Sequence, residues 1–145
     1  MIDLMNTDPI LGQELITRIE DGNKLQQCGK VQKALEIYLG CWDRLPSQKT
    51  DIELFGSWIA DCISDIYFYE KDFKNSLKWM KQSFEARAGD EETSSSIKLG
   101  AIYMKMGDEY NAFEWFNRAY SIGKKRAFQE FPKEYWDFYK SRSKK

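Results

Sequence analysis

The sequence predicts an all-α protein built from antiparallel pairs of helices. Apolar residues recur at helical spacing through most of the 145 residues, and no segment alternates apolar and polar residues like a strand. A second observation is a spacing of small and aromatic residues that occurs three times. Its clearest copy consists of Gly100, Tyr103, Gly107, Ala112, Phe116 and Ala119. The same offsets recur from Gly22 and from Ser64, which indicates three copies of one helix–turn–helix unit.

Residues that favour helix ends mark the boundaries of these units. Asp8 before Pro9 predicts a helix start, because the aspartate side chain can accept a hydrogen bond from a free backbone amide and proline fits the first turn. Thr50 and Glu53 have the spacing of a capping box, which predicts another start at Thr50. Together these signals predict three hairpins, over about residues 9–46, 50–88 and 93–124.

A further helix is expected over about residues 132–143, with Pro132 in its first turn. Its aromatic residues are Tyr135, Trp136, Phe138 and Tyr139. Such a helix would not be soluble by itself, so we expect it to cover the exposed flank of the last hairpin. Because no Ser/Gly-rich linker interrupts the chain, residues 1–145 are expected to form a single domain.

Composition is that of an ordinary globular chain, with 42% hydrophobic residues, 31% charged residues and a net charge of −1. No apolar run is long enough to span a bilayer, and the first residues lack the features of a secretory signal, so a cytoplasmic location is expected. Residues 1–72 carry 13 acidic and 7 basic side chains (net −6), and residues 73–145 carry 10 and 15 (net +5). Such a gradient can steer a charged partner or reflect unselected surface variation. The three cysteines are expected to be buried as small hydrophobic residues.

The repeated spacing resembles the tetratricopeptide repeat, a helix–turn–helix unit of 34 residues. The copy from Gly100 keeps every small, aromatic and turn position, and the copy from Gly22 keeps most of them. The copy from Ser64 is the weakest, with serines at small positions and Lys71 in place of the turn glycine. The steps between copies are 42 and 36 residues, and the first excess is expected to extend the helices and the loop around residues 47–50.

The resemblance implies a right-handed superhelical stack of three hairpins, an α-solenoid closed by the aromatic C-terminal helix. Small residues should let the two helices of a hairpin approach, whereas we expect Tyr38, Met80 and Phe116 to fill the space between neighbouring hairpins. In this family the first helices of the hairpins line a concave groove that binds an extended peptide or a helix.

The groove-facing positions of those first helices supply the candidate partner-binding residues. They are Asn23, Trp58, Asp61, Asp65, Phe68, Tyr69, Ile97, Met104 and Lys105, and Ile16, Ile19, Gln26 and Ala101 are further groove-facing positions. Five of them share one side of the middle helix and combine aromatic anchors with two carboxylates. A partner with Lys or Arg next to an apolar or aromatic side chain fits this pattern better than an acidic peptide terminus. Alternatively, Trp58 and Phe68 pack inside the protein and the aspartates are merely solvated.

Catalysis is not expected. The chain has no histidine, which excludes histidine-based catalytic and metal-binding groups, and it has no glycine-rich phosphate-binding loop. No cofactor and no metal are therefore expected. The preferred interpretation is a bacterial, cytoplasmic adaptor or chaperone-like protein that binds one partner segment.

Three alternatives remain open at this stage: an immunity-type protein, a self-associating structural protein such as a homodimer, and a nucleic-acid-binding protein. The last would use basic residues close to aromatic ones near the C-terminus. These are Lys124, Lys125, Arg126, Lys133, Lys140, Arg142, Lys144 and Lys145. The acidic pI of about 5.6 argues against this third alternative.

Overall fold

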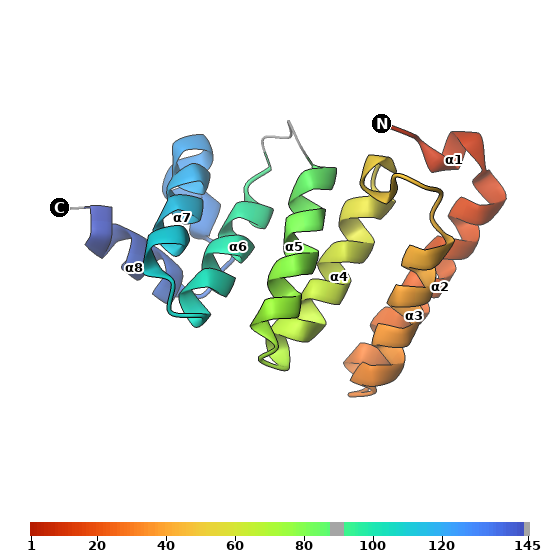
Figure 1. Ribbon diagram of the computed structural model, residues 1–145, viewed down its shortest axis with the longest axis horizontal. Helices are drawn as coiled ribbons and strands as arrows, with labels where there is room; N and C mark the ends of the chain where they lie inside the picture. The colour runs from red at the N-terminus through yellow and green to blue at the C-terminus, as the bar shows by residue number, and fades with distance from the viewer. Residues whose placement is uncertain (88–91, 144–145) are drawn as a thin grey trace. The chain divides into compact units, whose positions relative to one another are not determined.

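The computed structural model describes residues 1–87 and 92–143, and the chain divides into two compact units, Met1–Ala88 and Gly89–Lys145 (Figure 1). In the described residues every element is helical, apart from an isolated bridge between Ile2 and Ile52. The predicted all-α class is confirmed. None of the described helices has the length and apolar character needed to cross a membrane.

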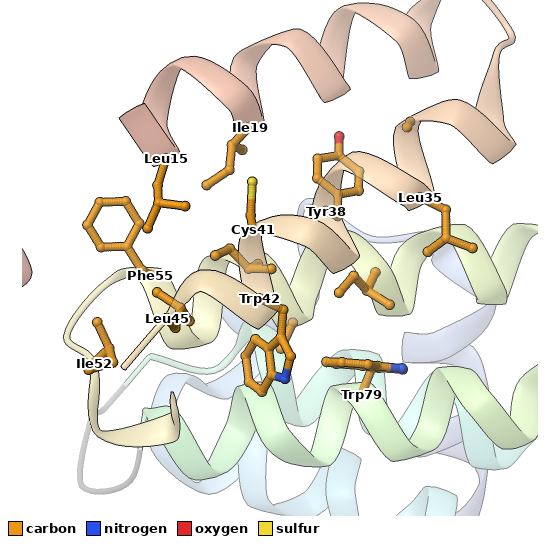
Figure 2. Close-up of a cluster of buried hydrophobic side chains, with 14 of the residues drawn as sticks. Leu15, Ile19, Leu35, Tyr38, Cys41, Trp42, Leu45, Ile52, Phe55 and Trp79 are labelled. Atoms are coloured by element: carbon orange, nitrogen blue, oxygen red, sulfur yellow. The ribbon is translucent and has the colours of Figure 1, made fainter. Parts of the chain in front are cut away.

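The first unit holds two helical hairpins. Its elements are α1 (Leu4–Thr7), α2 (Pro9–Gln27), α3 (Val31–Arg44), the 3-10 turn η1 (Lys49–Asp51), α4 (Phe55–Tyr69) and α5 (Phe73–Ala86). Helix α2 pairs with α3 and α4 pairs with α5, while α3 also packs on α4. The side chains between these helices form one hydrophobic core, in which the rings of Trp42 and Trp79 meet edge to face at 5.1 Å (Figure 2).

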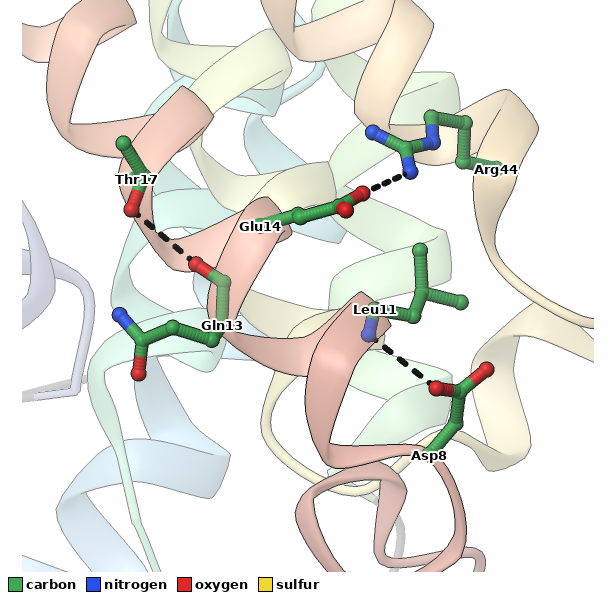
Figure 3. A network of polar contacts seen from close by, with 6 residues as sticks. All are labelled: Asp8, Leu11, Gln13, Glu14, Thr17 and Arg44. Carbon is green, nitrogen blue, oxygen red and sulfur yellow. Dashed lines mark hydrogen bonds and ion pairs between the residues drawn. The ribbon is translucent and has the colours of Figure 1, made fainter.

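The start of α2 is the one that the sequence predicts. The Asp8 carboxylate accepts a hydrogen bond from the amide of Leu11 at 3.1 Å, and Pro9 occupies the first turn (Figure 3). Beyond this cap, Glu14 on α2 forms an ion pair with Arg44 at the end of α3, which ties the two helices of the hairpin together. Both side chains are about half exposed, so the pair contributes little to stability.

The second unit holds the third hairpin and the aromatic C-terminal helix. Its elements are α6 (Ser94–Lys105), α7 (Glu109–Gly123), the 3-10 turn η2 (Lys124–Phe128) and α8 (Lys133–Ser143). Helix α8 packs on α7, with Tyr135 stacked 5.8 Å from Phe116 and Tyr139 stacked 5.2 Å from Phe113. The expected aromatic helix therefore does cover a flank of the last hairpin.

The turns between the two helices of each hairpin have the same geometry. Its central residue has a positive φ in every case: Gly29 (79°), Lys71 (64°) and Gly107 (79°). The amide that follows donates to the carbonyl five residues earlier, at 2.9 Å in all three turns. This bond closes a helix C-terminus around a left-handed residue. Lys71 therefore occupies the glycine position of the repeat, as the sequence alignment of the weak middle copy predicts.

Tyr38 and Phe116 contact the glycine of their own hairpin as well as a neighbouring element, which is α4 at Cys62 for Tyr38 and α8 at Tyr135 for Phe116. A Cβ atom added to Gly22 would lie 2.6 Å from the ring of Tyr38, and one added to Gly100 would lie 2.5 Å from the ring of Phe116. Each aromatic ring thus rests on the glycine of its own hairpin. In the middle hairpin the serines replace this contact, since Ser64 Oγ donates to the carbonyl of Ser76 at 2.7 Å.

The start of the middle hairpin also differs from the prediction. No capping box forms at Thr50 and Glu53. Instead Ile2 donates to the carbonyl of Asp51 and accepts from the amide of Glu53, both at 2.8 Å, so the N-terminal residues pair with this segment. Ile52 is buried beneath the pairing, and α4 begins only at Phe55. The extra residues of the first repeat step therefore lie partly in the connector after α3 and partly at the start of α4, which is longer than α6, whereas α3 and α5 have the same length. The predicted end of this hairpin, residue 88, lies outside the described residues.

Candidate functional site

A polar cluster joins α2, α3 and α4 in the first unit. The hydroxyl of Tyr38, on α3, donates to Oδ1 of Asn23 at 2.5 Å and lies 3.2 Å from Oε1 of Gln26. Asn23 and Gln26 are half-buried residues of α2. Tyr38 itself is fully buried, so its hydroxyl group is the polar end of an otherwise apolar side chain packed in the core.

Helix α4 contributes to the same cluster. Burial raises the pKa of Tyr38 far above its ordinary value, and the thiol of Cys62 and the carboxylate of Asp65 add to the rise. The hydroxyl is therefore protonated across the physiological range and acts as a donor. Asn23 thus bonds to the same tyrosine on which the charge of Asp65, on a different helix, acts.

Asp61 lies one helical turn before Asp65 on α4 and is also held in place. Its Oδ1 accepts a hydrogen bond from Ser83 Oγ of α5 at 3.3 Å. The same hydroxyl lies 3.2 Å from the carbonyl of Ser57. Both aspartates are half-buried, so neither is fully solvated.

The three predicted aromatic anchors of α4 differ in exposure. Trp58 is half-buried, packs against the core and stacks on Phe55 at 6.1 Å. Phe68 is half-buried and meets Phe73 edge to face at 5.6 Å. Tyr69 is 76% exposed and lies 6.0 Å from Phe68. Much of the surface of Trp58 is thus buried by packing, whereas Phe68 and Tyr69 expose aromatic surface at the end of α4.

The α2–α4 surface is the name used here for the exposed parts of this region. It consists of Asn23, Gln26, Asp61, Asp65, Phe68 and Tyr69, with the Tyr38 hydroxyl beneath them. It combines two carboxylates, two amides and aromatic rings, which suits recognition of a partner by hydrogen bonds, charge and apolar contact. In the described part of the chain no three acidic or cysteine side chains gather as a metal site.

The candidates of the third hairpin are placed differently. Ile97, on α6, is fully buried and offers no surface to a partner, which corrects the expectation for this residue. Its position faces the interior because α6 is apolar on more than one side. Met104 is half-buried, and Lys105 is exposed, with its ammonium 3.6 Å from the carboxylate of Glu134 on α8.

Two residues of the cluster, Tyr38 and Cys62, are missing from the sequence-based candidates for partner binding, whereas Gln26 is one of the predicted groove-facing positions. Ile19 and Ala101, which are predicted to face the groove as well, are buried. Tyr38 has the spacing of a core residue, and nothing in the sequence shows that its hydroxyl reaches a polar region.

The expectation that all cysteines are buried is wrong for Cys28, which is exposed, while Cys41 is buried and Cys62 is intermediate. Cys28 ends α2 just before the turn, where no second helix covers it.

Paired antiparallel helices of this kind are the architecture of helical-repeat proteins, and a family match exists for the third hairpin. Residues 94–124 match the tetratricopeptide repeat family. The N-terminal domain of stress-induced protein-1 (STI-1) from C. elegans has a similar structure, with a TM-score of 0.68 at 19% identity over 89% of this chain and 97% of that one. The resemblance inferred from the sequence is confirmed.

Two further solved structures share the fold. The first tetratricopeptide repeat domain of Spaghetti (RPAP3), bound to the HSP90 peptide SRMEEVD, gives a TM-score of 0.67 at 16% identity over 91% of this chain and 92% of that one. MamA gives 0.63 at 18% identity over 97% of this chain and 72% of that one. At these identities the likeness shows the fold alone. No curated protein matches the chain in sequence.

Proposed function

We propose that this protein is a non-catalytic interaction module that binds a peptide or a helix of a partner protein at the α2–α4 surface. The observation that carries the proposal is the hydrogen bond from the Tyr38 hydroxyl to Asn23 of α2, next to half-buried Asp61 and Asp65 of α4, of which Asp65 is close enough for its charge to act on that hydroxyl. The fold supports it, because the similar RPAP3 domain was solved with a bound peptide. An adaptor or chaperone-like role follows from such binding.

The chemistry of the surface indicates the kind of partner. Asp61 and Asp65 place two carboxylates one turn apart on α4, and the exposed ring of Tyr69 lies farther along the same helix. A segment with Lys or Arg next to an apolar or aromatic side chain complements both features. An acidic segment such as SRMEEVD would be repelled by the two carboxylates.

A selection from a displayed random-peptide library tests this proposal. Among the peptides enriched on the full chain, those that lose affinity for the D61N/D65N variant should contain Lys or Arg next to an apolar residue. Calorimetry should show that the D61N/D65N variant binds the selected peptide at least about tenfold more weakly, because both carboxylates lose their charge while their shape is kept. SRMEEVD serves as the acidic comparison peptide and should not bind at this surface.

The matched control is E36Q/D43N, which removes two exposed carboxylates from α3 and should leave the affinity unchanged. Circular dichroism checks that both variants keep their helicity. Unchanged affinity of D61N/D65N, or a library that enriches acidic peptides there, would contradict the proposal.

A further inference from the structure

The second unit contains a cavity of about 300 Å³ between η2 and α8. Its apolar walls come from the rings of Phe128, Phe131 and Trp136, and three lysine side chains surround them. These are Lys125, Lys133 and Lys140. We call it the η2–α8 pocket. All of its lining residues lie between 125 and 140, so it is separate from the α2–α4 surface.

The pocket uses a different side of α8 from the one that carries Tyr135 and Tyr139, although its Trp136 also contacts Tyr120 of α7. Tyr135 and Tyr139 are buried against the hairpin. Lys133, Trp136 and Lys140 follow one another at helical spacing on a different side and line the pocket. The ring of Trp136 is held by Phe128 at 5.3 Å, so this wall is preformed.

The lining of the pocket is positively charged. Three ammonium groups and the single carboxylate of Asp137 line it, so the lining carries a net charge of +2 (three minus one). The ammonium of Lys125 lies 5.6 Å from the ring centroid of Trp136, a cation–π contact that keeps the charge next to the apolar wall. An anionic group bound here would meet positive charge directly beside a hydrophobic surface.

The size of the pocket and the packing of its rings limit the occupant. A volume of about 300 Å³ is at the low end for ligand sites and suits one inserted side chain. Single-stranded nucleic acids need open ring faces on which successive bases stack. Here Phe128 is 4% exposed, and Trp136 packs against Phe128, Tyr120 and Tyr139. A peptide is therefore favoured over a nucleic acid.

We propose that the η2–α8 pocket binds an acidic peptide segment of a second partner, in which one apolar side chain is flanked by Asp or Glu residues. The apolar side chain occupies the space between Phe131 and Trp136. The flanking carboxylates pair with Lys133 and Lys140 at the two ends of the pocket side of α8. The pocket thus selects the opposite charge from the α2–α4 surface.

The test uses the full chain and the peptide Ac-Glu-Glu-Phe-Glu-Glu-NH2 as probe, with calorimetry at low ionic strength. The wild-type chain should bind the probe, and K133Q/K140Q should bind it about tenfold more weakly. Binding should also weaken as salt is added, because the contacts are charged and close to the surface. The matched control K33Q/K74Q removes two exposed lysines from the first unit and should bind as the wild type does.

Three results would overturn the proposal. One is an affinity of K133Q/K140Q equal to that of the wild type, and another is equal binding of Ac-Glu-Glu-Ala-Glu-Glu-NH2, which lacks the apolar side chain. The third is an oligothymidylate strand that binds more tightly than the peptide and loses its affinity in K133Q/K140Q. D61N/D65N should bind the acidic probe normally, so failure of this proposal is distinguishable from failure of the proposed function.

Discussion

At the scale of single residues, close contact between a glycine and an aromatic ring defines the clear repeats. In the third hairpin the ring of Phe116 occupies the space where a side chain on Gly100 would begin. We expect G100A to lower the free energy of unfolding by about 1–3 kcal/mol, because the added methyl group overpacks a buried contact. Urea unfolding followed by circular dichroism measures the change.

Gly40 provides the matched control for this substitution. It lies in the middle of α3, and a Cβ added there would have no heavy atom within 4 Å. G40A should therefore stabilise the protein by about 0.5–1 kcal/mol through the higher helix propensity of alanine. If G100A proved as harmless as G40A, the glycine–aromatic contact would not be a determinant of the hairpin.

The turn residue Lys71 gives a prediction of the opposite sign. Its φ of 64° is unfavourable for a residue with a Cβ atom, whereas the equivalent Gly107 adopts 79° without strain. K71G should therefore stabilise the protein by about 0.5–1 kcal/mol, and G107A should destabilise it by about 1 kcal/mol. Urea unfolding of the two variants compares them, and a loss of stability in K71G would show that the lysine side chain contributes more than its backbone costs.

At the scale of elements, the second helix of each hairpin begins at an equivalent position but is capped unequally. Asp72 and Asp108 each accept the amide of the asparagine three residues on, at 3.2 Å and 3.1 Å. The side-chain amide of the same asparagine donates a second hydrogen bond, of 2.7 Å, to the aspartate carboxylate in both cases. Lys30 holds the same position before α3 and makes no side-chain bond. The first hairpin thus lacks a cap that the other two share.

The cap at Asp108 predicts a dependence of stability on pH. Hydrogen bonds from the Asn111 side chain and then from its backbone amide lower the pKa of Asp108 in the folded state. The stability that they supply is present above the unfolded pKa and is lost as the pH falls through the folded pKa. D108A should therefore lower Tm at neutral pH, and the difference from wild type should vanish once the pH falls below the lowered pKa of the Asp108 carboxyl. Thermal melts across this range measure it.

K30D is the complementary variant. The backbone of Lys30 has φ −88° and ψ 63°, close to the −89° and 81° of Asp108, so an aspartate can cap α3 without rearrangement. The free energy of unfolding of this variant should rise by about 1 kcal/mol at neutral pH.

For the cap at Asp108, a constant difference in Tm between D108A and wild type down to acid pH would contradict the capping explanation.

At the scale of the whole molecule, repetition made the hairpins predictable. The small, aromatic and turn positions recur in the sequence, so the copy with Gly100 revealed the register of the copy with Lys71. The pairing of Ile2 with the segment after Asp51 was not predictable, because it joins distant parts of the chain without a repeated pattern. The candidate site was predictable only in part. The helical faces of Asn23 and Asp65 indicate that both side chains are near the surface. The role of the Tyr38 hydroxyl was not predictable, because the ring has the spacing of a core residue.

The last prediction concerns the association of the whole chain and depends on α8. This helix stacks Tyr135 on Phe116 and Tyr139 on both Phe113 and Phe128, so its removal would uncover a contiguous aromatic patch. Terminal repeats need such a cover, and exposed patches of this kind drive association. A chain that stops after Phe131 should sediment as larger, concentration-dependent species than the full chain. The control is K133Q/K140Q, which keeps all the covering rings and should sediment like the wild type. If the truncated chain sedimented like the full chain and α6 and α7 stayed helical, the hairpin would be stable without α8.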